Sequence, residues 1–269
     1  MDALDLILKP DETEPGTAEV YVDGTVDGRP YRFLLDTGAA RSSIVADDYT
    51  LTFPSIEKHD SSGVFAASSA DVITVPGLAV GPIARREFTL VRAPVDSPGT
   101  NTLIGMDLLK DFRCRFLFDE NRVLLENSAA PAAHPALQAL FLDAKAHPYV
   151  DVQFGAATAH AVWDTGASLT VVDLAFIRRH PEAFQESGTS TGTDATGTSV
   201  ETPMFDMAAT VIGGATFPPV RVAGVELSPV NATIQTPMDL ILGYNILSRA
   251  HWLFDFPRRQ WAITKPPGE

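Results

Sequence analysis

The triplet Asp-Thr-Gly occurs twice in this chain of 269 residues, beginning at Asp36 and at Asp164, 128 residues apart. Each aspartate follows a short apolar stretch, residues 33–35 in the first case and 161–163 in the second. A carboxylate placed there is costly unless it is paired or used in chemistry. If the two triplets meet, the two carboxylates cannot both ionise comfortably and must share one proton. Such a pair can deprotonate a water molecule and protonate a carbonyl oxygen, which is general acid–base hydrolysis without a metal or a covalent intermediate.

The other residues of each triplet fit the same arrangement. Gly38 and Gly166 allow a sharp backbone turn that brings main-chain N–H groups toward the carboxylate. Thr37 and Thr165 can form hydrogen bonds across the seam and hold the two loops together.

The sequence around the triplets is an internal repeat. Residues 31–45 return as 159–172, and residues 101–125 return in the same order as 239–263. Both later segments contain two apolar residues followed by glycine, Gly105 and Gly243, where a side chain would displace the carboxylate loop. A duplicated lobe is the simplest explanation.

The elements that must position these residues are mostly strands, so we predict a mainly β (all-β) fold. Residues 18–36 alternate apolar and polar residues and turn at Asp-Gly pairs, and residues 150–164 do so around Gly155. Short helices are expected after Gly105 and after Gly243, with 137–144 and 173–179 as further candidates.

The Ala/Pro-rich segment 128–136 marks the seam between the repeats. We therefore predict two lobes related by a pseudo-twofold axis, at residues 1–128 and 135–269, joined by a linker at 129–134.

These motifs resemble the aspartic peptidase clan over nearly the whole chain. Each half is similar to a bacterial retropepsin-like domain, and two such lobes in one chain are similar to the bilobal pepsin plan. The resemblance implies an aspartic endopeptidase, a hydrolase in which Asp36 and Asp164 activate one water molecule, with no cofactor and no metal. Its partner would be a peptide or protein substrate in the cleft between the lobes.

Two positions after the triplets depart from the pepsin pattern. Pepsin-like enzymes usually carry Ser or Thr directly after the triplet, whereas this chain has Ala39 and Ala167, as retroviral enzymes do. Losing that hydroxyl donor should raise the pKa values of the two carboxyl groups, which predicts a milder pH optimum than that of pepsin. The next residue is Ser168 in the second repeat but Ala40 in the first, where Ser or Thr is common.

Flap hairpins are expected at residues 59–75 and 186–200. The second segment is rich in Gly, Ser and Thr, as in a mobile hairpin tip. None of the five tyrosines falls in either segment, so the flap tyrosine of pepsin has no counterpart. If both hairpins close over a substrate, the residues over the cleft would be Gly63, Val64 and Phe65 on one side and Gly192 to Gly197 on the other.

Composition narrows the class of partner. With 34 acidic and 20 basic residues, the net charge of −14 repels phosphate backbones and anionic membranes, so no nucleic acid and no membrane partner is expected. The single cysteine, Cys114, and an N-terminus without a signal-peptide pattern point to a cytoplasmic protein. We expect a monomer.

Two alternatives remain open. The chain could be a catalytically inactive peptide-binding module that retains the fold, since a motif and a fold do not guarantee activity. Alternatively, the lobes could separate and pair with their copies in another chain, which would double the mass at high concentration.

Overall fold

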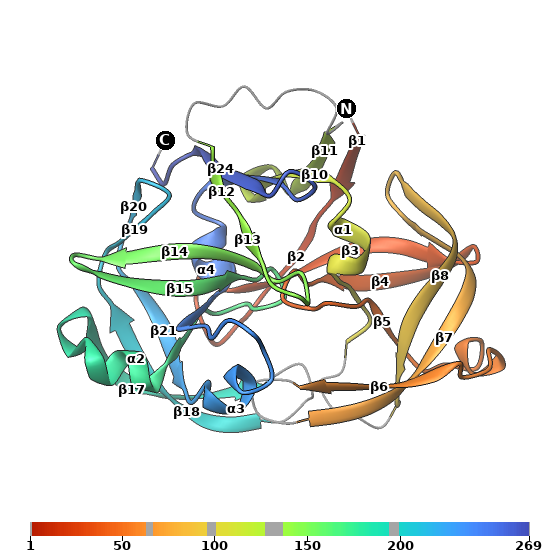
Figure 1. Ribbon diagram of the computed structural model, residues 1–269, viewed down its shortest axis with the longest axis horizontal. Coiled ribbons are helices and arrows are strands. Elements are labelled where there is room, and N and C mark those ends of the chain that lie inside the picture. Colours follow the sequence, from red (N-terminus) through yellow and green to blue (C-terminus); the bar gives the residue numbers. More distant parts are fainter. Residues whose placement is uncertain (1, 63–66, 96–100, 127–136, 194–198, 269) are drawn as a thin grey trace.

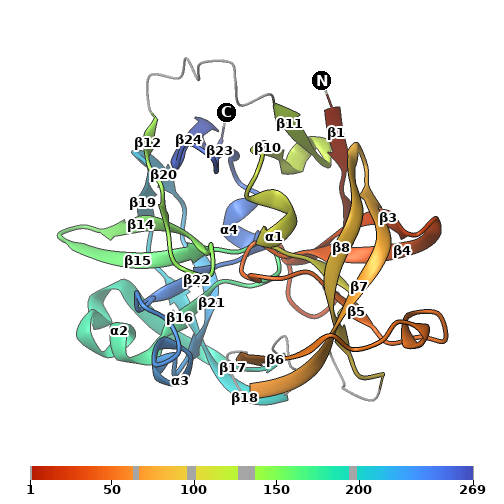
Figure 2. The ribbon, with the colours of Figure 1, turned by 45° about the vertical axis from the view of Figure 1, so that its right-hand side comes forward.

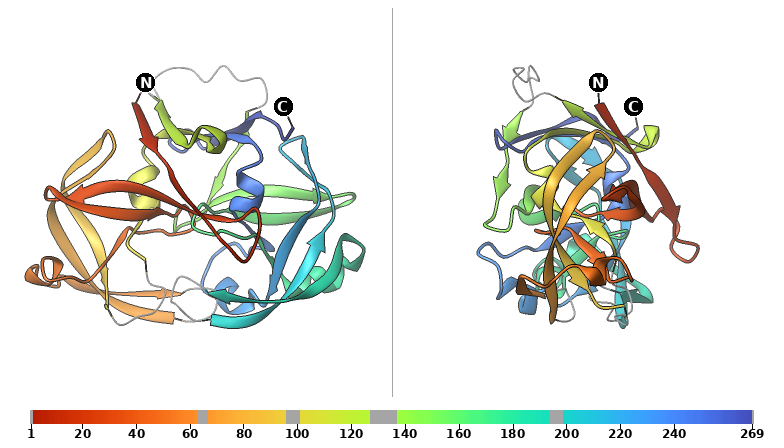
Figure 3. Two further views of the ribbon diagram at one scale, coloured as in Figure 1. Left: turned by 180° about the vertical axis from the view of Figure 1, so that it is seen from behind. Right: turned by 90° about the vertical axis from the view of Figure 1, so that its right-hand side faces the viewer.

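Strands make up most of the molecule and the helices are short, which confirms the all-β prediction (Figure 1). This computed structural model describes residues 2–62, 67–95, 101–126, 137–193 and 199–268. We call the part up to residue 126 the N-terminal half and the part from residue 137 the C-terminal half. The two halves lie side by side beneath a sheet to which both contribute strands (Figures 1 and 3).

An eight-stranded sheet forms most of the N-terminal half. Its β3–β4 hairpin turns where the sequence predicts, because Asp27 and Gly28 have φ angles of 49° and 78°, the left-handed conformation of a tight two-residue loop. The strands, in sheet order, are β2 (Ile7–Pro10), β3 (Ala18–Val26), β4 (Arg29–Leu35), β9 (Leu103–Ile104), β5 (Ser43–Val45), β8 (Ile83–Ala93), β7 (Ala67–Val80) and β6 (Glu57–Ser62).

The other Asp-Gly pair of this segment, Asp23-Gly24, does not form the predicted turn and lies inside β3. Strand β3 pairs there with two strands, because Gly24 is opposite Tyr31 of β4 and Val80 of β7. A Cβ atom on Gly24 would lie 2.6 Å from the carbonyl oxygen of Ala79. Glycine at this position therefore allows two strands to approach closely rather than the chain to reverse.

A ten-stranded sheet forms most of the C-terminal half. Its β14–β15 hairpin turns at Gly155, with a φ of 58°, as predicted. The strands, in sheet order, are β17 (Phe184–Thr193), β18 (Ser199–Met207), β21 (Val220–Val225), β16 (Val171–Asp173), β22 (Leu240–Leu242), β15 (Ala157–Trp163), β14 (Pro148–Phe154), β19 (Thr210–Ile212) and β20 (Ala215–Phe217), with β13 (Phe141–Leu142) added beside β14.

The repeat in the sequence is also a repeat in strand pairing. Tyr21 lies opposite Leu34 in the first hairpin, and Tyr149 lies opposite Val162 in the second, each shifted by 128 positions. Leu34 and Val162 then pair in parallel with strands β9 and β22, which precede Gly105 and Gly243. Equivalent residues of the two halves therefore occupy equivalent places.

A six-stranded sheet joins the halves. Its central pair is β10 with β23, in which Phe116 of the N-terminal half lies opposite Trp252 of the C-terminal half. The Trp163 ring packs beneath it, with its centroid 4.6 Å from those of Phe116 and Phe254. In sheet order the strands are β1 (Asp2–Asp5), β11 (Arg122–Glu126), β10 (Arg113–Leu117), β23 (His251–Asp255), β24 (Gln260–Lys265) and β12 (Gln138–Ala139).

Three of the predicted helices are present. Helices α1 (Met106–Leu109) and α4 (Tyr244–Leu247) follow the two glycines and lie beneath the shared sheet, and α2 (Leu174–Arg179) follows β16 (Figure 2). The remaining helical turns were not predicted: α3 (Ser228–Asn231), η1 (Thr50–Thr52), η2 (Phe118–Glu120) and η3 (Pro181–Ala183). No helix in the described part of the chain is long and apolar enough to cross a membrane.

The predicted helix at 137–144 is wrong, because these residues form β12 and β13 instead. Strand β12 pairs with Gln260 and Trp261, and β13 pairs with Pro148 and Tyr149. Two sheet edges therefore satisfy its backbone hydrogen bonds, which overrides a weak local helix preference. The predicted linker, 129–134, lies outside the described residues.

Candidate active site

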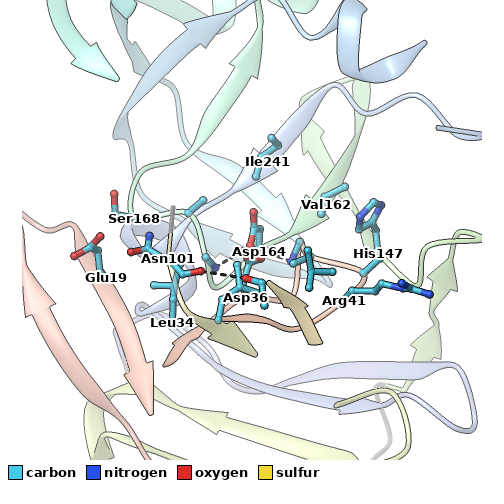
Figure 4. Close-up of a pocket in the computed structure, with 18 of the residues that line it drawn as sticks. Glu19, Leu34, Asp36, Arg41, Asn101, His147, Val162, Asp164, Ser168 and Ile241 are labelled. Atoms are coloured by element: carbon cyan, nitrogen blue, oxygen red, sulfur yellow. Dashed lines mark hydrogen bonds between the residues drawn. The ribbon is translucent and has the colours of Figure 1, made fainter. Parts of the chain in front are cut away.

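Strands β4 and β15 end immediately before the two aspartates and deliver them to the same place. Asp36 N donates to the carbonyl oxygen of Ile104 at 2.9 Å, and Asp164 N donates to that of Leu242 at 3.0 Å. The strands after each triplet loop thus hold the two aspartates in matching positions. Figure 4 shows the two side chains next to one another at the centre of a cleft.

The two threonines join the loops through reciprocal hydrogen bonds. Thr37 Oγ1 donates to the carbonyl oxygen of Trp163 at 2.8 Å, and Thr165 Oγ1 donates to that of Leu35 at 2.6 Å. Each hydroxyl also accepts the N–H of the opposite threonine, at 3.0 and 3.2 Å. Both threonines are buried, so this network fixes the separation of the two halves where the aspartates meet.

The two triplet glycines lie against the carboxylate of the opposite half. A Cβ atom on Gly38 would lie 2.6 Å from Cγ of Asp164, and one on Gly166 would lie 2.5 Å from Cγ of Asp36. Both glycine N–H groups donate to the same atom, Asp164 Oδ1, at 3.1 and 2.8 Å. The pair is therefore asymmetric, since these two amides stabilise negative charge on Asp164.

Burial raises the pKa of both carboxyl groups above the ordinary range of aspartate. The pKa of Asp36 is raised furthest, first by burial and then by the neighbouring Asp164 carboxylate. Burial also raises the pKa of Asp164, but hydrogen bonds with the Gly166 amide, the Asp36 side chain and the Gly38 amide oppose it. Two carboxyl groups in this environment do not readily ionise together, and the geometry favours residence of a shared proton on Asp36.

A second set of hydrogen bonds supports each loop from behind, and the sequence interpretation did not include it. In the N-terminal half, Ser42 donates its N–H and its hydroxyl to the two carboxylate oxygens of Asp107, at 2.8 and 2.6 Å. In the C-terminal half, Thr170 donates both groups to Oδ1 of Asn245, at 2.9 and 2.7 Å. Burial raises the pKa of Asp107, whereas its counterpart Asn245 cannot titrate.

The sequence carried a signal for this set. A hydroxyl residue stands six positions after each triplet aspartate, and an aspartate or asparagine stands two positions after each of the glycines 105 and 243. Those glycines lie close to the loops, as expected. A Cβ atom on Gly105 would lie 2.7 Å from the carbonyl oxygen of Ala39, and one on Gly243 would lie 2.6 Å from the carbonyl carbon of Leu169.

The aspartates lie in a cleft of about 1930 Å³ lined by both halves. Of the predicted site residues, the two aspartates, Gly38, Ala39, Gly166, Ala167 and Ser168 line this cleft. Thr37 and Thr165 lie behind them. The structure thus brings both triplets and the residues that follow them to one place.

The two segments predicted as flaps form hairpins, β6–β7 and β17–β18. Of the predicted flap residues, Gly192 lies in β17 opposite Val200, whereas Gly63, Val64, Phe65 and Gly197 lie outside the described residues. Both hairpins contribute other residues to the cleft lining, which the sequence interpretation did not identify: His59, Ser69, Ala70, Ser190, Thr191 and Thr202.

Residues 22–108 match the family model of aspartyl proteases. The matched segment runs from β3 through α1 and contains the first triplet together with Gly105. No curated protein matches the chain. The match supports a peptidase of the aspartyl protease class, and it covers the N-terminal half only.

Proposed function

We propose that this protein is an aspartic endopeptidase that hydrolyses peptide bonds with a water molecule held between Asp36 and Asp164. The observation that supports this most directly is the reciprocal packing at Gly38 and Gly166, where each half provides the space for the carboxylate of the other. The aspartyl protease match over residues 22–108 supports the same class of activity.

The asymmetry of the pair assigns a role to each aspartate in this proposal. Asp164 is the base, because the N–H groups of Gly38 and Gly166 stabilise its charge, and Asp36 is the acid that carries the shared proton. Asp164 takes a proton from the water as its oxygen attacks the peptide carbonyl carbon, while Asp36 gives its proton to the carbonyl oxygen. As the tetrahedral intermediate collapses and its C–N bond breaks, Asp164 gives its proton to the amine nitrogen and Asp36 takes back the proton of one hydroxyl, which restores the starting state of the pair.

The cleft is proposed to hold the substrate as an extended chain. Hairpins β6–β7 and β17–β18 both line it, and their strand edges offer main-chain hydrogen bonds to such a peptide. We propose that one chain is sufficient, with the lobes at 1–128 and 135–269 acting as a monomer, because each half already supplies one aspartate.

A mixed peptide library incubated from about pH 3 to pH 7.5 tests the proposal, with Asp36→Asn and Asp164→Asn proteins alongside. Cuts made only by the parent protein, and blocked by a statine-type inhibitor, are the expected result. Binding of library peptides without any cut at any pH would contradict it and favour a peptide-binding module.

A further inference from the structure

The two ends of the cleft carry residues of different charge character at equivalent positions. Glu19 and His147 each precede the matched tyrosines, Tyr21 and Tyr149, by two residues, so the repeat makes them counterparts. Both line the cleft. Figure 4 shows them on opposite sides of the aspartate pair, so one end of the cleft carries an acidic group and the other an imidazole.

A second pair of counterparts adds to this difference. Arg41 and Leu169 each lie five residues after a triplet aspartate, and both line the cleft. Figure 4 places Arg41 on the same side as His147, and it places Ser168, the neighbour of Leu169, on the same side as Glu19. The cation Arg41 thus lies at the imidazole end, while the acidic end has leucine in its place.

Contacts at the imidazole end hold the basic groups at the cleft wall. His147 Nδ1 lies 2.8 Å from Oδ2 of the buried Asp143, which orients the ring and leaves Nε2 for a ligand. Arg41 pairs at 3.0 Å with Glu57, which also lines the cleft, and both side chains remain about half exposed. Lys145, in the same loop as His147, also lines this cleft.

At the acidic end, more carboxylates line the cleft than the neighbouring basic residues pair with. Glu19 pairs with Lys9 at 2.9 Å, and Glu14 pairs with Arg221 at 2.9 Å. Asp11 and Glu12 line the cleft beside them, which leaves this end negative overall.

We propose that this difference orients the substrate: the cleft favours peptides with an acidic side chain at the His147–Arg41 end and a basic side chain at the Glu19 end. A cleft built from two identical lobes would bind a peptide equally well in either direction. A difference in charge between equivalent positions removes that degeneracy, because only one orientation places an acidic side chain near Arg41 and a basic one near Glu19. The proposal specifies the substrate class of the proposed endopeptidase and rests on that function.

Peptides that differ at one position test this orientation. Starting from a peptide that the protein cuts, Glu, Gln or Lys is placed two to four residues from the cut on either side. We expect kcat/KM to favour Glu over Lys by roughly fivefold on one side of the cut, and Lys over Glu on the other. The preference should shrink as salt is added, because the groups are partly exposed.

Symmetrising variants identify the residues responsible. Arg41→Leu places at the imidazole end the residue type found at the equivalent position, Leu169. It should lower the ratio of kcat/KM for Glu peptides to that for Lys peptides on that side of the cut only. The matched variant Leu169→Arg should lower the Lys/Glu ratio on the opposite side. Equal ratios on both sides for the parent protein, or the same change on both sides in a variant, would overturn the proposal.

The failure of this inference is distinguishable from that of the proposed function. If the parent protein cuts no peptide, the proposed endopeptidase function is wrong. The charge preference is then measured as binding of the same peptides, fluorescently labelled, by fluorescence anisotropy. Binding without a charge preference would refute the orientation, and a preference in binding alone would retain it for a peptide-binding module.

Discussion

Asp36 and Asp164 are identical residues at equivalent positions, yet their surroundings differ. Two glycine amides donate to Asp164, while Asp36 is the more buried of the two residues. The loss of a hydroxyl donor at Ala39 and Ala167 was expected to raise the two pKa values, and in the structure burial is the largest cause of the increase. In the proposed mechanism the pair is active while it holds one proton.

The first prediction concerns the pH dependence of catalysis. The acid limb of the profile reports a second proton on Asp164, and the alkaline limb reports loss of the proton from Asp36. Because both pKa values are raised, both limbs shift upward, and kcat/KM should peak above about pH 4. A pH–rate profile with its maximum near about pH 2 would contradict this.

The second prediction concerns stability. An acid with a raised pKa in the folded chain binds its proton more tightly there, so stability falls as the pH rises from the ordinary carboxyl range through the raised pKa. Asp36→Asn removes the loss of stability that comes from ionising this buried carboxyl group. The Tm of the variant at pH 7 should therefore exceed that of the parent by at least about 2 °C. The difference should narrow toward pH 3.

A control for this stability effect is Glu12→Gln. It removes one negative charge from an exposed side chain, so it should leave Tm nearly unchanged. A lower Tm for Asp36→Asn than for the parent at pH 7 would show that the buried carboxylate does not cost stability.

At the scale of elements, the triplet loops depend on close approach rather than on a special backbone conformation. The third prediction is that Gly38→Ala or Gly166→Ala lowers kcat/KM by roughly a hundredfold, because each Cβ would displace the opposite carboxylate. The variants should also lose about 1–3 kcal/mol of unfolding free energy through overpacking.

Gly77→Ala in β7 is the matched control, since its Cβ would meet nothing closer than the Arg85 carbonyl oxygen at 3.7 Å. Turnover assays and denaturant titrations of the three variants measure both effects. Full activity in Gly38→Ala would mean that the loops can move apart without cost.

At the scale of the molecule, strands of both halves pair in one sheet, so we expect the two halves to unfold together. Phe116 is fully buried against Trp163 and Phe254 of the other half. The fourth prediction is that Phe116→Ala costs about 3–5 kcal/mol and that fluorescence and circular dichroism still report a single transition. Phe141→Ala, at an exposed position on β13, should cost less than about 1 kcal/mol. Two separate transitions would show that the halves unfold independently.

Much of this fold could be predicted because the signals are local and occur twice. The apolar strands that end at the aspartates, the turn at Asp27-Gly28 and the short helices after Gly105 and Gly243 follow from alternation and turn chemistry.

The features that could not be predicted depend on contacts between distant segments. Residues 137–144 form strands because two sheet edges lie beside them, and Gly24 continues a strand because β7 crosses it. Ser42 and Asp107 lie 65 positions apart in the chain and meet only in the folded structure.

The sequence by itself determined the duplicated strand pattern and the two residues able to share a proton, because periodicity and turn residues act within a few positions. The tertiary structure alone decided which aspartate receives both glycine amides, which strands join the halves, and which charges lie at each end of the cleft. Hydrogen bonds such as that from Gly38 to Asp164 join segments more than 100 residues apart, and no local pattern specifies how such segments meet.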